Sequence, residues 1–213
     1  ISEEVFIPKK NLTNFINNRE GSDSRILVIE ASNSLYNAFD SDDVRLFVNI
    51  NFNSNNSGPS DPDNNIHLIN KYPGNASAFL SDVKVMRVSE MYLIKAETQV
   101  TLNDLDGAAV TLKALRDARF GTSTALDSYA TQTAAYNEVL KERRLELAFE
   151  GHRYLDIKRF KERLNSGINR DALDCASGGN CVMLPSDHRL TLPIPQVELN
   201  ANPSIIQNPG YGN

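Results

Sequence analysis

The sequence KERRLELAFEGHRYLDIKRF, residues 141–160, combines apolar side chains at helical spacing with a high density of charge. Glu142, Glu146 and Glu150 recur every fourth residue, so a helix would carry three carboxylates on one face, which alone disfavours helix formation. Guanidinium groups, which can bridge carboxylates with two hydrogen bonds, are close by in the sequence; they belong to Arg143, Arg144, Arg153 and Arg159. We therefore interpret residues 137–160 as a charged, largely buried helical brace.

The brace is expected to hold a structural network of ion pairs, and no catalytic residue is predicted in it. Its expected members are Arg87, Glu97, Glu142, Arg143, Glu146, Glu150, Arg153 and Asp156. The alternative is a glycosidase, because carboxylates four residues apart on a helix lie about 5–6 Å from each other, near the spacing of a retaining pair. Carboxylates surrounded by arginines would both stay ionised and leave no proton donor. The pattern therefore favours a protein that is not an enzyme.

Two further helices are predicted before the brace. Residues 85–100 carry apolar side chains on most faces and contain no Gly or Pro, which indicates a buried helix. Residues 105–120 follow the capping candidates Asn103 and Asp104, place Ala108, Leu112 and Leu115 on one stripe, and end at Gly121. Together they form a hairpin of about 34 residues, the length of a tetratricopeptide repeat. A third helix is expected from 133 to 150, with a helical continuation after Gly151.

The predicted fold class is mainly α, a tetratricopeptide-like hairpin plus further helices, with long irregular loops and an extended proline-rich C-terminal tail. We expect a single domain with a loop-rich part (1–80), a helical part (81–168) and a loop and tail (169–213). In the first part a strand is predicted at 25–30 and a short helix at 34–39. Residues 51–65 contain six asparagines, two prolines and one glycine, which predicts an exposed loop. Four prolines after Leu190 predict an extended tail laid over the helices.

Composition and charge restrict the partners. The chain has 213 residues, 22 Lys plus Arg against 27 Asp plus Glu, and a net charge of −5. Without a run rich in Lys and Arg, nucleic acid is not expected as a partner. The longest apolar runs, such as residues 26–29, are far shorter than the roughly 20 residues that cross a bilayer. The N-terminal residues show no secretion signal, so such a signal is absent or already removed.

Cofactors and metals are not predicted. Cys175 and Cys181 fit neither a zinc pair nor a redox CxxC motif, and a small disulfide loop or two free thiols are the two interpretations. No metalloprotease, nucleophile-elbow or phosphate-loop motif occurs. The acidic runs at 40–43 and 61–65 offer oxygen ligands for calcium, but the second lacks the glycine and distal glutamate of an EF-hand, so we interpret both as solvated loops.

Four stretches of the chain are informative together: DDVRL (42–46), RVSEMYLIKAE (87–97), the brace sequence 141–160, and LPIP (192–195) with NPSIIQNPGY (202–211). These stretches resemble the SusD/RagB family of outer-membrane nutrient-binding lipoproteins. They occur in the family's order and at family-like distances. The resemblance covers only the C-terminal half of the family's usual length, so the N-terminal half, with its lipidated cysteine, is expected to lie outside this chain.

The resemblance implies a function that the spacing does not show. Members of this family capture oligosaccharides or polysaccharides at the cell surface and pass them to a TonB-dependent, SusC-like transporter. The expected location is the outer membrane, with membrane association only through a lipid anchor outside this chain. Capture of peptides is the first alternative, since relatives do that. A docking scaffold with no ligand site in this half is the second.

Candidate ligand residues come from sugar chemistry, because the family's ligand residues vary too much to be carried over. Sugar binding uses aromatic faces for stacking and planar amides for hydroxyl groups, and the chain has no tryptophan. The aromatic candidates are Tyr36, Phe39 and Phe52, and the amide candidates are Asn37, Asn53, Asn55 and Asn56. The alternative for each aromatic candidate is packing in the core, and the alternative for each asparagine is a solvated side chain with no ligand contact.

Overall fold

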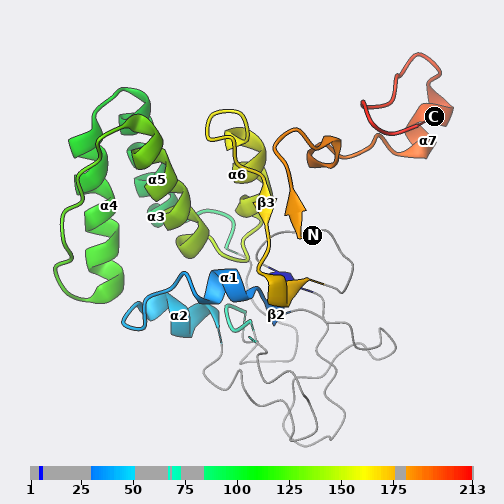
Figure 1. Cartoon of the computed structure of the whole chain (residues 1–213). Helices are drawn as coiled ribbons and strands as arrows, with labels where there is room; N and C mark the ends of the chain where they lie inside the picture. Colours follow the sequence, from blue (N-terminus) through cyan, green and yellow to red (C-terminus); the bar gives the residue numbers. More distant parts are fainter. Residues whose placement is uncertain are drawn as a thin grey trace, which may run out of the picture.

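A computed structural model describes residues 5–6, 30–50, 67, 69–72, 84–175 and 181–212. The fold is mainly α, as predicted (Figure 1). Its helices are α1 (Asn33–Tyr36), α2 (Val44–Asn49), α3 (Val88–Thr101), α4 (Leu105–Phe120), α5 (Gln132–Glu146), α6 (His152–Phe160) and α7 (Gln196–Ala201), with 3-10 turns at Ala172–Asp174 and His188–Leu190. Short strands pair antiparallel, β1 (Val5–Phe6) with β2 (Glu30–Ala31) and β3 (Ile168–Asn169) with β4 (Val182–Met183).

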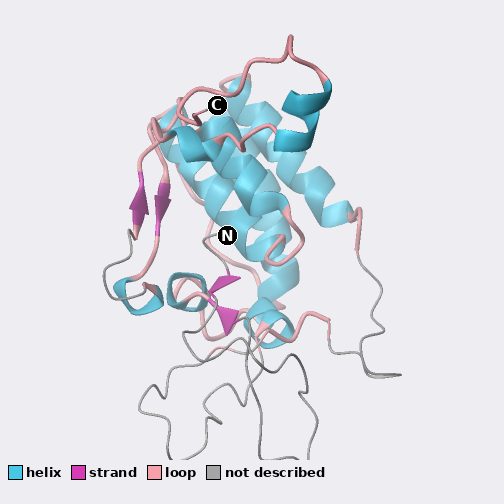
Figure 2. Cartoon of the chain, turned by 90° about the vertical axis from the view of Figure 1, so that its right-hand side faces the viewer, coloured by secondary structure: helices cyan, strands magenta, loops and turns pink. Residues whose placement is uncertain are grey.

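Helices α3, α4 and α5 pack together around the largest apolar core (Figure 2). Leu93 and Val100 of α3, Leu112 of α4 and Val139 of α5 are fully buried in it. Ala96 and Ala108 are also fully buried, as expected for small residues where two helices cross closely. A second core cluster joins α1 and α2 to the end of α5. None of the helices in the described part of the chain has the length and apolar character needed to cross a bilayer.

Helix α4 has the bounds that its sequence predicts. The Asp104 side chain accepts a hydrogen bond from the Gly107 amide at 3.0 Å, which satisfies one of the free donors of the first turn. At the other end Gly121 adopts φ 65°, a left-handed conformation that glycine reaches without strain. Both signals are local, so the sequence alone was sufficient to place them. The assignment of the α3–α4 hairpin as a tetratricopeptide repeat stays a prediction.

The third helix ends earlier than predicted. Helix α5 stops at Glu146 instead of 150, and Phe149 at φ 63° and Gly151 at φ 85° turn the chain before α6. Carbonyl groups at the end of α5 and just after it accept from distant segments: Arg87 donates to the Glu146 carbonyl at 2.6 Å and Lys71 to the Ala148 carbonyl at 2.6 Å. These contacts stabilise the break because they replace the hydrogen bonds that a longer helix would have made.

Helix α3 is not buried on most faces, which corrects the sequence prediction. Only a stripe that includes Leu93, Ala96 and Val100 faces α4 and α5. Val88, Met91 and Ile94 are about half or more exposed. The reason is that α3 packs on one side only, so its remaining apolar residues face away from the described part of the chain.

The C-terminal tail is also different from the prediction. A short helix, α7, lies between Pro195, which is its N-cap, and Pro203, because the seven residues between them contain no proline. Leu190 is fully buried with Ile157, but the chain beyond it leaves the helices, and α7 stands apart from them in Figure 1. The tail folds on itself instead: Gln207 bonds both the N–H and the carbonyl of Ile194, at 2.8 and 2.9 Å.

Candidate functional site

The carboxylates of the brace lie inside an ion-pair network. Glu142 accepts from Arg45 at 2.5 Å and from Arg116 at 2.7 Å. Glu146 accepts from Arg119 at 2.7 and 2.9 Å, from Arg87 at 2.7 Å and from Arg45 at 3.3 Å. Arg87 also pairs with Glu150 at 2.9 Å. Glu142 and Glu146 are both buried, so arginine side chains take the place of water around them.

Apart from Arg87, which was an expected member of the network, the partners of Glu142 and Glu146 differ from the ones that the sequence suggested. The arginines on Glu142 and Glu146 come from α2, α4 and the residue before α3, and none of them belongs to 143–159. The arginines of the brace make other contacts: Arg143 pairs with Asp156 at 2.9 Å, Arg159 with Glu97 at 2.6 Å, and Arg144 donates to Ser34 at 2.8 Å. The place of Arg153 in the network stays a prediction.

The pKa of Glu146 shows what the network can do chemically. Burial alone raises this pKa, but the hydrogen bonds from Arg119 and Arg87 and the charges of the arginines outweigh burial and hold it well below the ordinary value of 4.5. Glu146 is therefore an ionised carboxylate at neutral pH and has no proton to give to a leaving group. This argues against a glycosidase pair on α5.

The same pKa predicts how stability depends on pH. Because the folded-state pKa of Glu146 is depressed, its contribution is fully present above the unfolded value of about 4.5 and decreases as the pH falls below it. Urea unfolding between pH 7 and pH 3 should show this loss. The Glu146→Gln variant, which cannot titrate at this position, should be less stable at pH 7 and lose less free energy of unfolding over the same range. An equal loss in both proteins would contradict the prediction.

The candidate ligand residues at α1 fall into different environments. Tyr36 is 38% exposed and stacks on His67, with ring centroids 3.9 Å apart and planes 11° apart. Asn37, the C-cap of α1, is exposed. Phe39 is buried in the second core cluster, so its ring is not available as a stacking surface, which corrects that candidate. The remaining candidates lie outside the described residues; they are Phe52, Asn53, Asn55 and Asn56.

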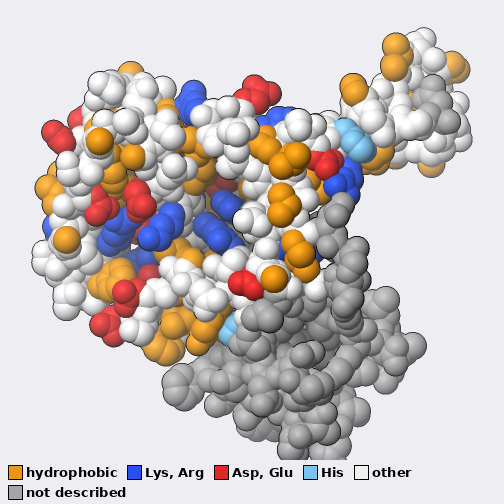
Figure 3. All heavy atoms as spheres, in the orientation of Figure 1, with side chains coloured by type: hydrophobic (Ala, Val, Ile, Leu, Met, Phe, Trp, Pro, Cys, Tyr) orange, Lys and Arg blue, Asp and Glu red, His pale blue; other side chains and the backbone are white. Residues whose placement is uncertain are grey.

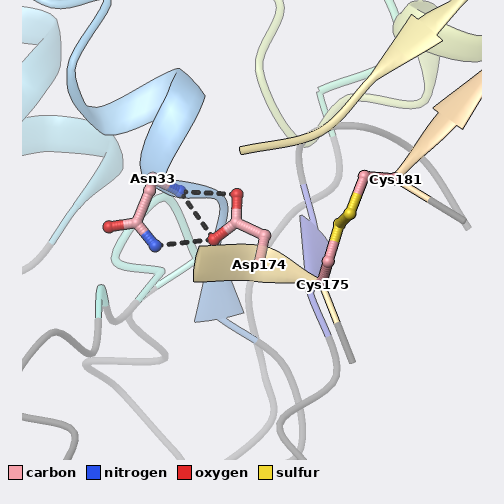
Figure 4. Close-up of a disulfide and its surroundings, with 4 residues drawn as sticks. All are labelled: Asn33, Asp174, Cys175 and Cys181. Carbon is pink, nitrogen blue, oxygen red and sulfur yellow. Dashed lines mark hydrogen bonds between the residues drawn. A yellow bond between two sulfur atoms is a disulfide. The ribbon is translucent and has the colours of Figure 1, made fainter. Parts of the chain in front are cut away.

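Helix α1 is held in place by contacts from distant parts of the chain (Figure 4). Asp174 accepts from the Asn33 backbone amide at 3.0 and 3.1 Å and from its side-chain amide at 2.6 Å. The Asn33 oxygen lies 3.1 Å from Nε2 of His67, the residue that stacks on Tyr36. Burial lowers the pKa of His67 more than Asp174 raises it, which favours a neutral ring. These contacts fix the orientation of Tyr36.

Asp174 is next to the disulfide that joins Cys175 and Cys181, with sulfur atoms 2.06 Å apart (Figure 4). The sequence interpretation left the disulfide and free thiols open, and the structure has the disulfide. Sequence reasoning missed both His67 and Asp174 as supports of α1. No local pattern marks them, because Asp174 is 141 positions from Asn33.

Metal binding finds no support in the described residues. Asp43 of the acidic run 40–43 caps α2 and pairs with Arg45 at 2.6 Å, so its oxygens are already engaged. Among the residues that the structure describes, no group of three or more His, Cys, Asp or Glu is placed to hold a metal ion. The other candidate run, 61–65, lies outside them.

The comparisons with known proteins point to one family. The model of the SusD family matches residues 64–211. A SusD superfamily protein of Bacteroides thetaiotaomicron VPI-5482 is 28% identical to this chain, with a TM-score of 0.65. The match covers 85% of this chain and 41% of the relative. A proposed sugar-binding protein of Bacteroides vulgatus ATCC 8482 is 27% identical to this chain, with a TM-score of 0.64. The match covers 87% of this chain and 40% of the relative. The chain spans about two fifths of the length of these relatives.

A further similar structure supports the fold alone. Surface glycan-binding protein A from Bacteroides uniformis is 22% identical with a TM-score of 0.61, over 85% of this chain and 41% of its own. A search of curated protein sequences found no match.

Proposed function

Because the chain belongs to the SusD family, as its four sequence stretches indicated, we propose that it binds oligosaccharides at the cell surface without catalysing a reaction. The proposal includes delivery of the sugar to a TonB-dependent, SusC-like transporter in the outer membrane. The observation that carries it is the family match over residues 64–211. A relative of 27% identity that is described as a sugar-binding protein agrees with it.

The proposed contact surface is the end of α1. Tyr36 offers a half-exposed ring whose position is set by His67, and Asn37 beside it offers an amide that can donate to and accept from hydroxyl groups. The apolar face of a sugar ring packs on such an aromatic side chain. The proposal also keeps four candidates because their aromatic and amide side chains suit sugar binding: Phe52, Asn53, Asn55 and Asn56.

The test is calorimetry of the full-length protein against a panel of oligosaccharides and peptides. The Tyr36→Ala variant should weaken the binding of the sugar that fits by about five- to tenfold, because the stacking surface is lost. Tyr36→Phe, which keeps the ring, should bind nearly as the natural protein does. Tyr92→Ala is the matched control, since Tyr92 is similarly exposed on α3. Binding of peptides and of no sugar would replace the proposal with peptide capture.

A further inference from the structure

A cleft of about 790 Å³ opens between the segment 38–45, the end of α4, the loop 121–131 and α5. This volume is in the usual range of small-molecule sites, about 300–1,000 Å³. Figure 3 shows Lys and Arg side chains gathered in the hollow between the α4–α5 pair and the α1–α2 segment below it. Tyr36, Asn37 and Phe39 are not among the residues that line the cleft.

The guanidinium of Arg116 connects the carboxylates of the cleft to one another. Arg116 of α4 donates to Glu142 at 2.7 Å and to Glu138 at 3.0 Å, both on α5, and it also pairs with Asp127 of the loop. The side chains of Asp127 and Glu138 are about one third exposed, while Arg116 is only 15% exposed. The arginine therefore fixes two carboxylates that still face solvent. Such fixed acceptors lose little entropy when a ligand donates to them.

The other lining groups complement these acceptors. Tyr129 donates its hydroxyl to Asp127 at 3.1 Å, which fixes an aromatic ring in the wall. Asn137 and Lys141 are exposed one turn apart on α5 and add donors. A sugar hydroxyl both donates and accepts, and its ring packs on aromatic carbon. Acceptors, donors and an aromatic ring around one cleft therefore suit a sugar better than an apolar ligand.

The charge of the lining restricts the sugar further. Five acidic residues (Asp40, Asp43, Asp127, Glu138 and Glu142) line the cleft against three basic ones (Arg45, Arg116 and Lys141). The basic side chains Arg45 and Arg116 are already paired with these carboxylates. An acidic sugar would meet an excess of negative charge. A neutral sugar would not.

We propose that this cleft is a second oligosaccharide-binding site, specific for neutral sugars and separate from the surface at Tyr36. The inference rests on the proposed function, because it assumes that the protein binds glycans. It goes beyond that function in assigning α4, α5 and the loop between them to ligand contact, where the sequence analysis predicted only packing.

The test uses the full-length protein and two classes of probe: neutral oligosaccharides of glucose, mannose, galactose and xylose, and acidic oligogalacturonates. Asn137→Ala and Lys141→Ala each remove an exposed side chain for which the structure shows no hydrogen bond to another described residue, so both variants should fold normally. Each should weaken the binding of a neutral oligosaccharide by about three- to tenfold. Lys158→Ala, which removes an exposed lysine from α6 outside the cleft, is the matched control and should bind as the natural protein does.

The same substitutions in a Tyr36→Ala background separate the two sites. The neutral-sugar binding that remains after Tyr36→Ala should be weakened by Asn137→Ala and by Lys141→Ala, and oligogalacturonates should not compete for it. If Tyr36→Ala abolishes all glycan binding, or if both cleft variants bind as Lys158→Ala does, the cleft proposal is wrong and the proposed function stands. If the natural protein binds none of the sugars, both are wrong.

Discussion

Replacing Glu146 with alanine should lower the free energy of unfolding by about 3–5 kcal/mol, because removing one partner leaves buried charges without compensation. Glu146 accepts hydrogen bonds from Arg45, Arg87 and Arg119, and its side chain is almost completely buried. Arg45 and Arg87 keep other carboxylates, but Arg119 loses the only acidic partner that the structure shows for it among the described residues. Urea unfolding of the full-length protein at pH 7 measures the loss.

Glu97→Ala is the matched control for this prediction. Glu97 also lies on a helix and also pairs with an arginine, but its partner Arg159 is 45% exposed. A pair at the surface contributes about 0–1 kcal/mol, since water solvates both charges when the pair is broken. A loss below about 1 kcal/mol for Glu146→Ala as well would mean that the arginines rotate into solvent, and the brace would then not depend on its buried charges.

Helix α4 was predictable because its signals are local. The cap at Asp104, the stop at Gly121 and the apolar stripe between them lie within one segment, and α4 has the predicted bounds. The end of α5 was not predictable in the same way. The carbonyl groups there bond to Lys71 and Arg87, which are far away in the sequence, and only the folded chain brings these residues together.

The ion-pair network shows the same limit. The sequence marked Glu142, Glu146 and Glu150 as residues that need cations, and the structure supplies cations to all three. It supplies them from elsewhere: Arg45 lies 97 positions from Glu142 and Arg119 lies 27 positions from Glu146. Burial of a carboxylate requires some partner, but the requirement does not identify which one. The sequence therefore predicts that these carboxylates have cationic partners, but it does not predict which residues the partners are.

The candidate binding surface was the least predictable part. Aromatic and amide side chains were chosen for their chemistry, and Tyr36 is half-exposed whereas Phe39, three residues later, is in the core. One face of α1 packs on the end of α5 and the other does not, and that choice depends on tertiary contacts. The supports of Tyr36, namely His67, Asn33 and Asp174, come from three separate segments. The cleft on α4 and α5 was missed for the same reason.

Replacing Leu112 with alanine should lower the free energy of unfolding by about 3–5 kcal/mol, because the lost methyl groups leave a cavity in a closely packed core. Leu112 is 1% exposed and lies in the cluster that joins α3, α4 and α5. Leu112→Met, which nearly conserves volume, should cost less than about 1.5 kcal/mol. Leu155→Ala makes the same chemical change at a 56% exposed helical position and should cost about 0.5 kcal/mol or less.

Urea unfolding of the three variants decides whether this cluster is the core on which the site depends. Similar losses for Leu112→Ala and Leu155→Ala would mean that the helices rearrange to fill the cavity, or that the cluster contributes little. A large loss for Leu112→Ala alone would show that α3, α4 and α5 form a rigid unit. Both the brace and the cleft need such a unit. Arg116 and Arg119 lie on α4, and Glu142 and Glu146, which accept their hydrogen bonds, lie on α5, so these distances are kept only if the two helices keep their positions.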